Sequence, residues 1–413
     1  MKQFYIDPDI SKAETLPGYF YHDKSIFESM KDQIFASSWQ WIGDKQLIRL
    51  ANTAYPFSLL DGYLNEPMVL VRTEDDIVKC LSNVCTHRGN IIVHNPGSCK
   101  FLTCMYHGRR FNQNGTFVSM PEFNLTENFP RPCDNLHAFN LVEWGPFLFT
   151  SISPIFDFHK ILSIMNERIG FLPLEEFVHQ PSLGKDYLVN AHWALYCDNY
   201  LEGFHIPFVH QDLNSVLDYG QYTTELYDFC NVQIGYAKDG EECFTLPEGH
   251  PDYGKSIAAY YYWIFPNMMF NFYPWGLSIN IVKPISIDKT KVSFITYVYD
   301  ETKLHSGAGA MLDKVEREDE YVVENVFKGF NFKIACCEVS YCLAIEKRVS
   351  LRPTMCLIVG GLFPCIAAGC LSENFIVDCL SMGLSGVSDK AAPFLGIFRR
   401  SPSLIPSLDL GLY

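Results

Sequence analysis

The sequence predicts an α+β protein of two domains, a small all-β domain followed by a larger one in which an antiparallel sheet packs over a long helix. Residues 39–150 run in short apolar stretches separated by Gly, Pro and Asn, which is typical of a β domain. Residues 259–300 alternate like long strands, and residues 313–330 have the charged periodic pattern of a helix. With 413 residues, the chain is long enough to form two hydrophobic cores.

Four segments follow from these patterns. Residues 1–38 are expected to pack on the second domain, and residues 39–150 to form the β domain. The second domain is expected over residues 151–333, with helices near residues 157–171 and 191–204 before its strands. Residues 334–413 form an atypical tail.

The tail differs from the rest of the chain in composition. It holds seven of the fifteen cysteines and none of the twelve histidines, which indicates a reading-frame shift or retained-intron read-through. The alternative is a membrane anchor, because residues 355–371 are apolar and uncharged and follow three basic residues. Gly360, Gly361 and Pro364 oppose a spanning helix there.

The charge balance excludes some classes of function. A net charge of -15 without any run of Lys or Arg argues against nucleic-acid binding. The N-terminus has neither the apolar core of a signal peptide nor the Arg-rich character of a transit peptide, so a cytoplasmic protein is predicted. In that setting the cysteines are expected to be metal ligands or free thiols.

Two Cys/His pairs in the β domain predict a metal centre. Cys85-Thr-His87 and Cys104-Met-Tyr-His107 are separated by sixteen residues, and each offers one thiolate and one imidazole. A [2Fe-2S] cluster with two Cys on one iron and two His on the other needs this set. The alternative is a Cys2His2 zinc site, although zinc fingers usually keep the two cysteines together and the two histidines together.

A second metal site is predicted around His205 and His210. Two imidazoles and a carboxylate on one face of Fe(II) leave open positions for O2 and substrate. Positions five apart on a regular helix lie about 140° apart, so the helix must break, and Pro207 is predicted to break it. The alternative is two unrelated histidines.

Residues 15–333 closely resemble the Rieske oxygenases, the ring-hydroxylating and related non-haem iron enzymes. The resemblance rests on Cys85-Thr-His87-Arg88-Gly89, on Cys104-Met-Tyr-His107-Gly108 and on the Glu202 to His210 segment. It implies a helix-grip catalytic domain, a [2Fe-2S] cluster on the two Cys/His pairs and a mononuclear Fe(II) on His205 and His210. Many members have Pro at the place of Met105 and Trp at the place of Arg109, but neither position supplies a ligand.

The resemblance also implies a third iron ligand and a bridging acid. Residues 315–324 resemble the helix that supplies the ligand, and Asp319 is the predicted one. An acid-rich helix can also be a solvated face, and four other acids lie nearby: Asp313, Glu318, Glu320 and Glu324. Glu202 is expected to share a helix face with His205 and to hydrogen-bond it. In the family this acid links the iron site to a cluster histidine, here His107, of the next subunit in a trimeric ring.

The function predicted from these motifs is oxygen insertion into a quaternary-ammonium compound such as choline. Glu202, where many relatives have Asp, resembles the choline and carnitine branch. The aromatic run 260–275 could hold a trimethylammonium group by cation–π attraction, although aromatic residues in strands mostly pack against the core.

Alternatives and partners complete the prediction. The enzymatic alternative is an aromatic-ring-hydroxylating dioxygenase alpha subunit, and the non-enzymatic ones are a zinc-stabilised binding protein or a decayed copy. Because no G-x-G-x-x-G motif occurs in a strand-turn-helix context, a separate NAD(P)H-dependent reductase is expected to supply the electrons. A homotrimer is expected, and membrane association is not.

Overall fold

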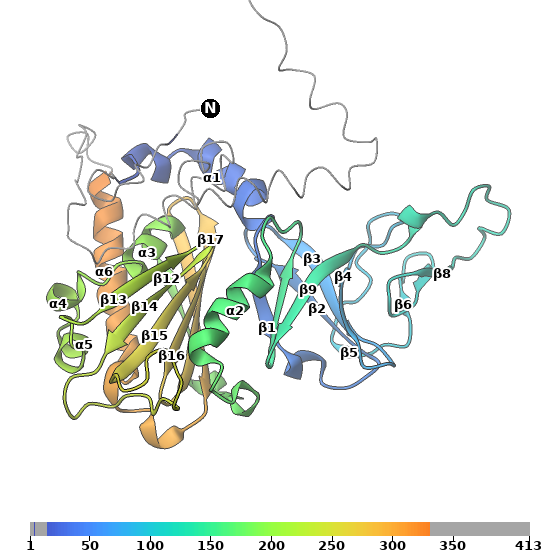
Figure 1. Ribbon diagram of the computed structural model, residues 1–413. Helices are drawn as coiled ribbons and strands as arrows, with labels where there is room; N and C mark the ends of the chain where they lie inside the picture. The colour runs from blue at the N-terminus through green and yellow to red at the C-terminus, as the bar shows by residue number, and fades with distance from the viewer. Residues whose placement is uncertain (1–3, 5–14, 331–413) are drawn as a thin grey trace, which may run out of the picture. The chain divides into compact units, whose positions relative to one another are not determined.

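The computed structural model describes residue 4 and residues 15–330 (Figure 1). The β domain is built on a seven-stranded antiparallel sheet. Its order is β1 (Gln40–Asp44), β10 (Phe147–Ser151), β9 (Ala138–Trp144), β4 (Val78–Ser82), β3 (Glu66–Arg72), β2 (Thr53–Leu59) and β5 (Gly97–Ser98). The short apolar stretches 68–71 and 147–149, expected from the sequence to be strands, are buried in β3 and β10.

A smaller sheet carries the second Cys/His loop of this domain, whereas the first loop lies between β4 and β5. This sheet consists of β6 (Leu102–Thr103), β7 (Arg110–Phe111) and β8 (Phe117–Ser119). Leu102, Phe111, Val69 and Leu81 form one apolar cluster together with both motif cysteines. The two loops are therefore fixed from below by the core of the domain.

The second domain contains an eight-stranded antiparallel sheet. Its order is β11 (Val178–His179), β18 (Lys289–Val298), β17 (Gly276–Ser286), β16 (Met268–Tyr273), β15 (Ile257–Ile264), β14 (Cys230–Tyr236) and β13 (Thr223–Tyr227), with β12 (Lys185–Val189) also paired to β18. The α+β class with an antiparallel sheet is confirmed.

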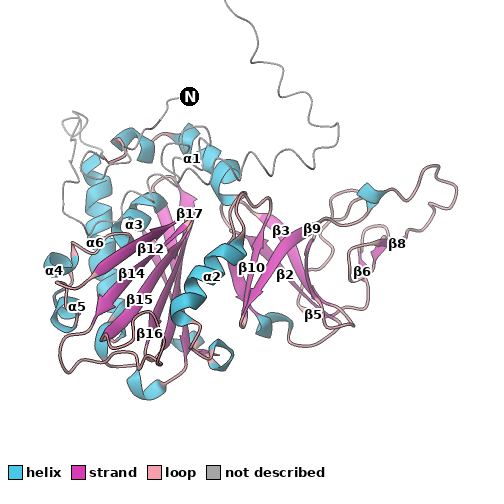
Figure 2. Ribbon diagram, in the orientation of Figure 1, coloured by secondary structure: helices cyan, strands magenta, loops and turns pink. Residues whose placement is uncertain are grey.

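The second domain contains five α-helices within the described residues (Figure 2). They are α2 (Phe158–Ile169), α3 (Trp193–Tyr200), α4 (Ile206–Val209), α5 (Gln211–Val216) and the long α6 (Leu312–Phe330), while α1 (Lys24–Met30) precedes the β domain. Helices α3 and α6 contact each other, and α3 also contacts β17. The expected helices near residues 157–171 and 313–330 are present.

The helix expected over residues 191–204 is shorter than predicted. It ends at Tyr200, with Leu201 as its C-cap residue. The carboxylate of Glu202 then accepts hydrogen bonds from the backbone N–H groups of Phe204, at 2.7 Å, and His205, at 3.2 Å. This side chain satisfies backbone N–H donors of the next turn, so helical structure begins again in α4 after the end of α3.

Within residues 15–330, no helix is both long and apolar enough to cross a membrane. The two interpretations of the tail, a frame-shifted segment or an anchor, concern residues that lie outside the described part of the chain.

Candidate metal centres and their pocket

The two Cys/His loops have the same backbone geometry. In each, the glycine four residues after the cysteine has a positive φ, +72° at Gly89 and +71° at Gly108. Each glycine N–H donates to the carbonyl of its cysteine, at 2.9 Å for Gly89 and 3.0 Å for Gly108. Glycine adopts this left-handed conformation without steric cost. Both motifs place a glycine four residues after the cysteine, and this glycine allows each loop to form a tight turn.

The four side chains of these loops are arranged by burial. Cys85 and Cys104 are buried, His87 is half-buried and His107 is exposed. The two imidazole rings lie 4.8 Å apart between centroids. Nδ1 of His87 is buried and has no hydrogen-bond partner within the described residues. Two inner sulfurs and two outer imidazoles are the donor set of a Rieske [2Fe-2S] cluster, so these residues fit that group.

The two cysteines also differ electrostatically. Burial raises the pKa of the Cys85 thiol. Burial opposes ionisation of Cys104 too, but backbone N–H groups of Tyr106 and His107, with the side chains of Cys85 and Asn90, outweigh it and lower its pKa. The thiolate is the form of cysteine that binds iron, and the loop around Cys104 provides hydrogen-bond donors that stabilise this thiolate.

Arg109, where many relatives have Trp, is buried beneath the second loop. Its guanidinium donates to Asp134 Oδ1 at 2.7 Å and lies within 6 Å of the rings of Phe111, Phe117 and Phe129. Thr86 of the first loop donates to the Asp134 carbonyl at 2.8 Å. Asp134 therefore ties the two loops together, a role that the sequence alone did not indicate.

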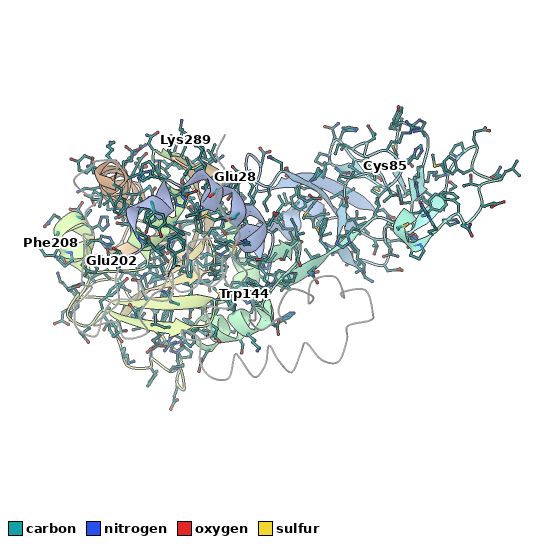
Figure 3. The ribbon with its side chains drawn as sticks, turned by 90° about the horizontal axis from the view of Figure 1, so that it is seen from above. Glu28, Cys85, Trp144, Glu202, Phe208 and Lys289 are labelled. Carbon is teal, nitrogen blue, oxygen red and sulfur yellow. The ribbon has the colours of Figure 1, made fainter. Side chains whose placement is uncertain are left out.

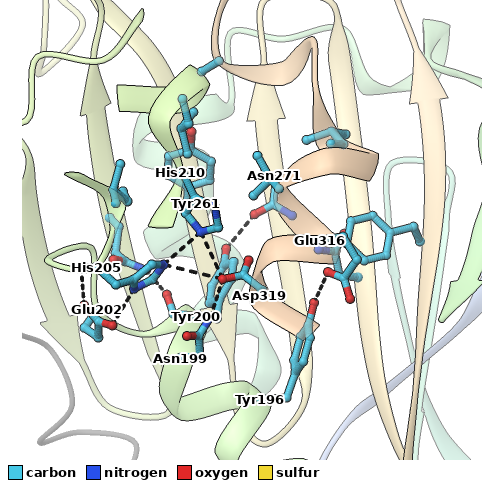
Figure 4. Close-up of a pocket in the computed structure, with 18 of the residues that line it drawn as sticks. Tyr196, Asn199, Tyr200, Glu202, His205, His210, Tyr261, Asn271, Glu316 and Asp319 are labelled. Atoms are coloured by element: carbon cyan, nitrogen blue, oxygen red, sulfur yellow. Dashed lines mark hydrogen bonds and ion pairs between the residues drawn. The ribbon is translucent and has the colours of Figure 1, made fainter. Parts of the chain in front are cut away.

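The predicted iron ligands come together in the second domain (Figure 4). His205 Nε2 lies 3.1 Å from His210 Nε2, and Asp319 Oδ1 lies 3.0 Å from His210 Nε2 and 3.6 Å from His205 Nε2. Among the described residues, these three form a candidate metal group whose ligand atoms all lie within 4.8 Å of one another. Adjacent ligands about 2.1 Å from one ion are about 3 Å apart, so the spacing fits a single metal.

A glutamate carboxylate lies within hydrogen-bond distance of Nδ1 of each histidine in this group. His205 Nδ1 lies 2.5 Å from Glu202 Oε1, and His210 Nδ1 lies 2.8 Å from Glu318 Oε2. Burial lowers the pKa of His210, but the carboxylates of Asp319 and Glu318 outweigh it and raise this pKa. With Nδ1 bound to a carboxylate, Nε2 of each ring remains for a metal.

Pro207 does not break the helix between the two histidines, and that prediction was wrong. It lies in the first turn of α4, where proline is tolerated because the N–H of that position has no helical partner. His205 and His210 flank this single turn, and the chain leaves helical geometry at His210, with φ -106° and ψ 74°. The departure from helical geometry therefore occurs at His210, after α4, and not at Pro207.

The metal group opens into a cavity of about 100 Å³. Five tyrosines are among the lining residues: Tyr196, Tyr200, Tyr222, Tyr261 and Tyr273. Hydrogen bonds fix several of them; Tyr200 donates to Asn271 Oδ1 at 2.6 Å, and Tyr222 donates to Gln233 Oε1 at 3.1 Å. The cavity is thus small, aromatic and rigidly lined.

The pleat of the sheet divides the aromatic run 260–275 between two faces. Tyr261 and Tyr273 line the cavity, with their rings 5.9 Å apart. Tyr260 instead donates to Asp252 at 3.0 Å, and Phe270 packs against aromatic rings of the β domain. Successive side chains of a strand point to opposite faces, so packing accounts for one set and the cavity for the other.

Three side chains near the metal group were not singled out from the sequence as site residues. Glu318 holds His210, and Asn199 donates to Asp319 Oδ1 at 2.7 Å. Glu316, one turn before Asp319, lines the cavity and accepts a hydrogen bond from Tyr196. Glu316 and Asp319 are three residues apart and therefore lie on one helix face. This spacing was the signal in the sequence that could have identified Glu316 as a site residue.

Comparison with known proteins identifies both domains. Residues 39–130 match the family model of the Rieske [2Fe-2S] domain, and residues 175–340 match that of the ring hydroxylating alpha subunit (catalytic domain). The chloroplastic choline monooxygenase of Arabidopsis thaliana is 26% identical over 353 residues, covering 78% of each chain. The carnitine monooxygenase oxygenase subunit of Escherichia coli (strain K12) is 26% identical over 331 residues, 77% of this chain and 84% of that one.

Solved structures share the fold. The quaternary ammonium Rieske monooxygenase CntA in complex with L-carnitine has a TM-score of 0.65 at 18% identity, covering 90% of this chain and all of that one. Naphthalene 1,2-dioxygenase with indole bound has a TM-score of 0.63 at 14% identity, covering 88% of this chain and 96% of that one. With both family models matched and this fold, the chain belongs to the Rieske non-haem iron oxygenases, as an oxygenase alpha subunit that uses a [2Fe-2S] cluster and a mononuclear iron.

Proposed function

We propose that this oxygenase inserts one atom of O2 into a C–H bond of a quaternary-ammonium compound such as choline. The observation that carries the proposal is the opening of a carboxylate-backed His/His/Asp group into a tyrosine-lined cavity. Tyrosine faces attract ammonium groups through their ring quadrupoles. Two proteins that resemble the chain are named for the quaternary-ammonium compounds choline and carnitine.

Each candidate residue has a distinct role in this proposal. Cys85, His87, Cys104 and His107 would hold the cluster, which supplies electrons one at a time. His205, His210 and Asp319 would hold Fe(II), which supplies open coordination positions for O2 activation. Glu202 positions His205 through Nδ1, as Glu318 positions His210, so both rings present Nε2 to one point.

The reaction balances as substrate, O2, two electrons and two protons giving hydroxylated substrate and water. Hydroxylation of the carbon that carries the choline hydroxyl gives a geminal diol, which loses water to leave an aldehyde. The electrons come from NAD(P)H through a separate reductase. The buried, hydrogen-bonded lining of the cavity restricts the entry of bulk water around the reacting carbon.

A homotrimer in the cytoplasm is part of the proposal, with electrons crossing between subunits from His107 of one chain to Glu202 of the next. Met105 and Tyr106 beside His107 are exposed, and Phe208, close to Glu202, is 81% exposed (Figure 3). In a ring in which these two sites meet, these exposed apolar side chains would be covered by the neighbouring subunit.

Spectroscopy and metal analysis test the cofactor assignments. Anaerobically purified and reconstituted protein should give a Rieske EPR signal after dithionite reduction and contain about three irons per chain. Asp319→Ala should keep the signal and lose one iron, whereas Cys104→Ser should lose the signal. Colourless protein containing zinc would contradict the assignments.

Product analysis tests the substrate class. With a suitable reductase and NADH, the oxygenase should convert choline to an aldehyde with one O2 consumed per product. Formation of cis-diols from aromatic substrates, with no turnover of quaternary-ammonium compounds, would support the ring-hydroxylating alternative instead.

A further inference from the structure

Glu316 is a buried acid in the wall of the cavity that no metal role explains. It lies on α6 one turn before Asp319, and its side chain is 2% exposed. One carboxyl oxygen accepts a hydrogen bond from Tyr196 of α3, and the other, Oε1, is buried without a hydrogen-bond partner within residues 15–330. Keeping such an oxygen unpaired in the interior costs stability, so it needs an explanation.

Within residues 15–330, no lysine or arginine of the cavity wall compensates this acid. None of the described residues that line the cavity is Lys or Arg. The adjacent Arg317 pairs with Glu320 at 3.3 Å and lies over the ring of Tyr187. Burial raises the pKa of Glu316, with Asp319 and Glu320 adding to the effect while Tyr196 and Arg317 oppose it. Within the described residues, an ionised Glu316 would therefore have no Lys or Arg partner in the cavity.

We propose that Glu316, oriented by Tyr196, binds the cationic headgroup of the substrate and selects ammonium compounds that carry no carboxylate. This inference rests on the proposed quaternary-ammonium function and deepens it. Tyrosine rings recognise the apolar and cationic character of the headgroup, whereas a carboxylate recognises its charge. A cation in the cavity also favours the ionised form of the acid that binds it.

The helix geometry links this anchor to the reaction centre. Residues three apart are neighbours on one helix face, so Glu316 and Asp319 face the same cavity. A headgroup at Glu316 leaves a short arm, such as the hydroxyethyl group of choline, to reach the group of His205, His210 and Asp319. A substrate with its own carboxylate would add a negative charge beside Glu202, Glu316 and Asp319, with no described Lys or Arg in the wall to pair with it.

The test compares a cation with its neutral isostere. Choline and 3,3-dimethyl-1-butanol have nearly the same shape, but only choline is charged. In Glu316→Gln, KM and the calorimetric Kd for choline should rise by roughly 30-fold or more, the usual effect of removing one partner of a buried charge pair. The values for the neutral alcohol should change little, and kcat should change less than KM. Loss of structure would affect both ligands alike.

Matched variants separate charge recognition from general effects of α6. Glu320→Gln removes the same charge from the same helix outside the cavity and should leave the preference for choline intact. Glu316→Asp keeps the charge and should retain most of the preference. Should Glu316→Gln fail to load iron, Tyr196→Phe removes the group that orients Glu316 and should weaken choline binding selectively.

The outcomes distinguish the two proposals. Equal preference for choline in wild type and Glu316→Gln overturns the role of Glu316 while leaving the quaternary-ammonium function in place. L-Carnitine bound by the wild type as tightly as choline overturns the selection against carboxylates. A fully iron-loaded wild type that neither binds nor oxidises choline or carnitine overturns both proposals.

Discussion

At both histidines of the candidate iron group, the ring nitrogen that faces away from the metal position is held by a glutamate. Glu202 is local in sequence to His205, whereas Glu318 reaches His210 from a helix more than a hundred residues later. Such pairs fix the tautomer of the ring and raise its basicity toward a metal. Asp319 and Glu318 are consecutive residues, so one turn of α6 supplies both a ligand and the support of another ligand.

Removing the support of His210 should weaken iron binding without removing a ligand. We expect Glu318→Gln to lower Fe(II) affinity by about 10- to 100-fold, measured by competition with a chelator in cluster-loaded protein. Glu320→Gln is the control, because Glu320 pairs with Arg317 instead. Equal affinity in both variants would mean that Glu318 does not act on the metal through His210.

At the scale of elements, the N-terminus of α3 depends on a histidine that must stay neutral. His192 is fully buried, and its Nδ1 accepts a hydrogen bond from the Ala194 N–H as the N-cap of the helix. Burial, with a smaller effect of His22, lowers the pKa of His192 to about 3. Helix α3 carries Tyr196, Asn199 and Tyr200, which line the cavity. Protonation of His192 would remove the N-cap of this helix and thereby disturb the wall of the cavity.

His192 should make the domain sensitive to acid. Its folded pKa is depressed below the unfolded value of about 6.5, so the unfolded state binds the proton first and stability falls as pH drops below about 6.5. The loss from this group between pH 7 and pH 5 should be about 2 kcal/mol. His192→Asn keeps a capping side chain and should remove that part of the pH dependence in urea unfolding. An unchanged slope in the variant would contradict this origin.

Gly203, between α3 and α4, packs directly on a cavity tyrosine. A Cβ at this position would lie 2.6 Å from Cε1 of Tyr222, so the ring must move. We expect Gly203→Ala to destabilise the domain by about 1–3 kcal/mol and to weaken substrate binding, measured by thermal unfolding and calorimetry. Gly97→Ala, where a Cβ meets nothing within 4 Å, should change neither. Wild-type binding in Gly203→Ala would show that Tyr222 does not shape the cavity.

The site shows which features sequence reasoning can and cannot reach. The antiparallel sheet of the second domain, α6 and the grouping of His205, His210 and Asp319 agree with the predictions. Strand alternation indicates the sheet, whereas Asp319 was implied by the resemblance of residues 315–324 to a helix of the family. The location of the break near Pro207 was missed, since proline also suits a first helical turn. The roles of Glu316 and Glu318 depend on which face of an acid-rich helix turns inward. That choice is made by tertiary packing, which a run of acids does not reveal.

For the whole molecule, the candidate cluster loops and the iron group belong to different domains, and each lies beside exposed apolar side chains. In a closed three-membered ring, every subunit meets two others through the same directed contact. In the proposed ring, transfer across that contact would make the assembly, and not the single chain, the unit of turnover.

Mixed assemblies test this arrangement. Cys104→Ser chains would lack the cluster and Asp319→Ala chains the mononuclear iron, so each homotrimer should be inactive. Any mixed ring has one junction in which an intact cluster faces an intact iron site in the right direction. Co-expressed, doubly tagged heterotrimers should therefore regain up to about one third of wild-type turnover. Inactive heterotrimers in which every chain still holds the one metal centre that its substitution leaves intact would indicate transfer within one chain.

The spacing of the ligands along the chain has a consequence for biosynthesis. All four candidate cluster ligands lie between Cys85 and His107, whereas the iron group is complete only when Asp319 has been made. At about 5–20 residues per second, the ribosome adds the intervening segment in roughly 10–40 s. During that interval a nascent chain already has all four cluster ligands, whereas its second metal site has at most two of its three ligands. The order of translation therefore sets the order in which the two centres become able to acquire iron.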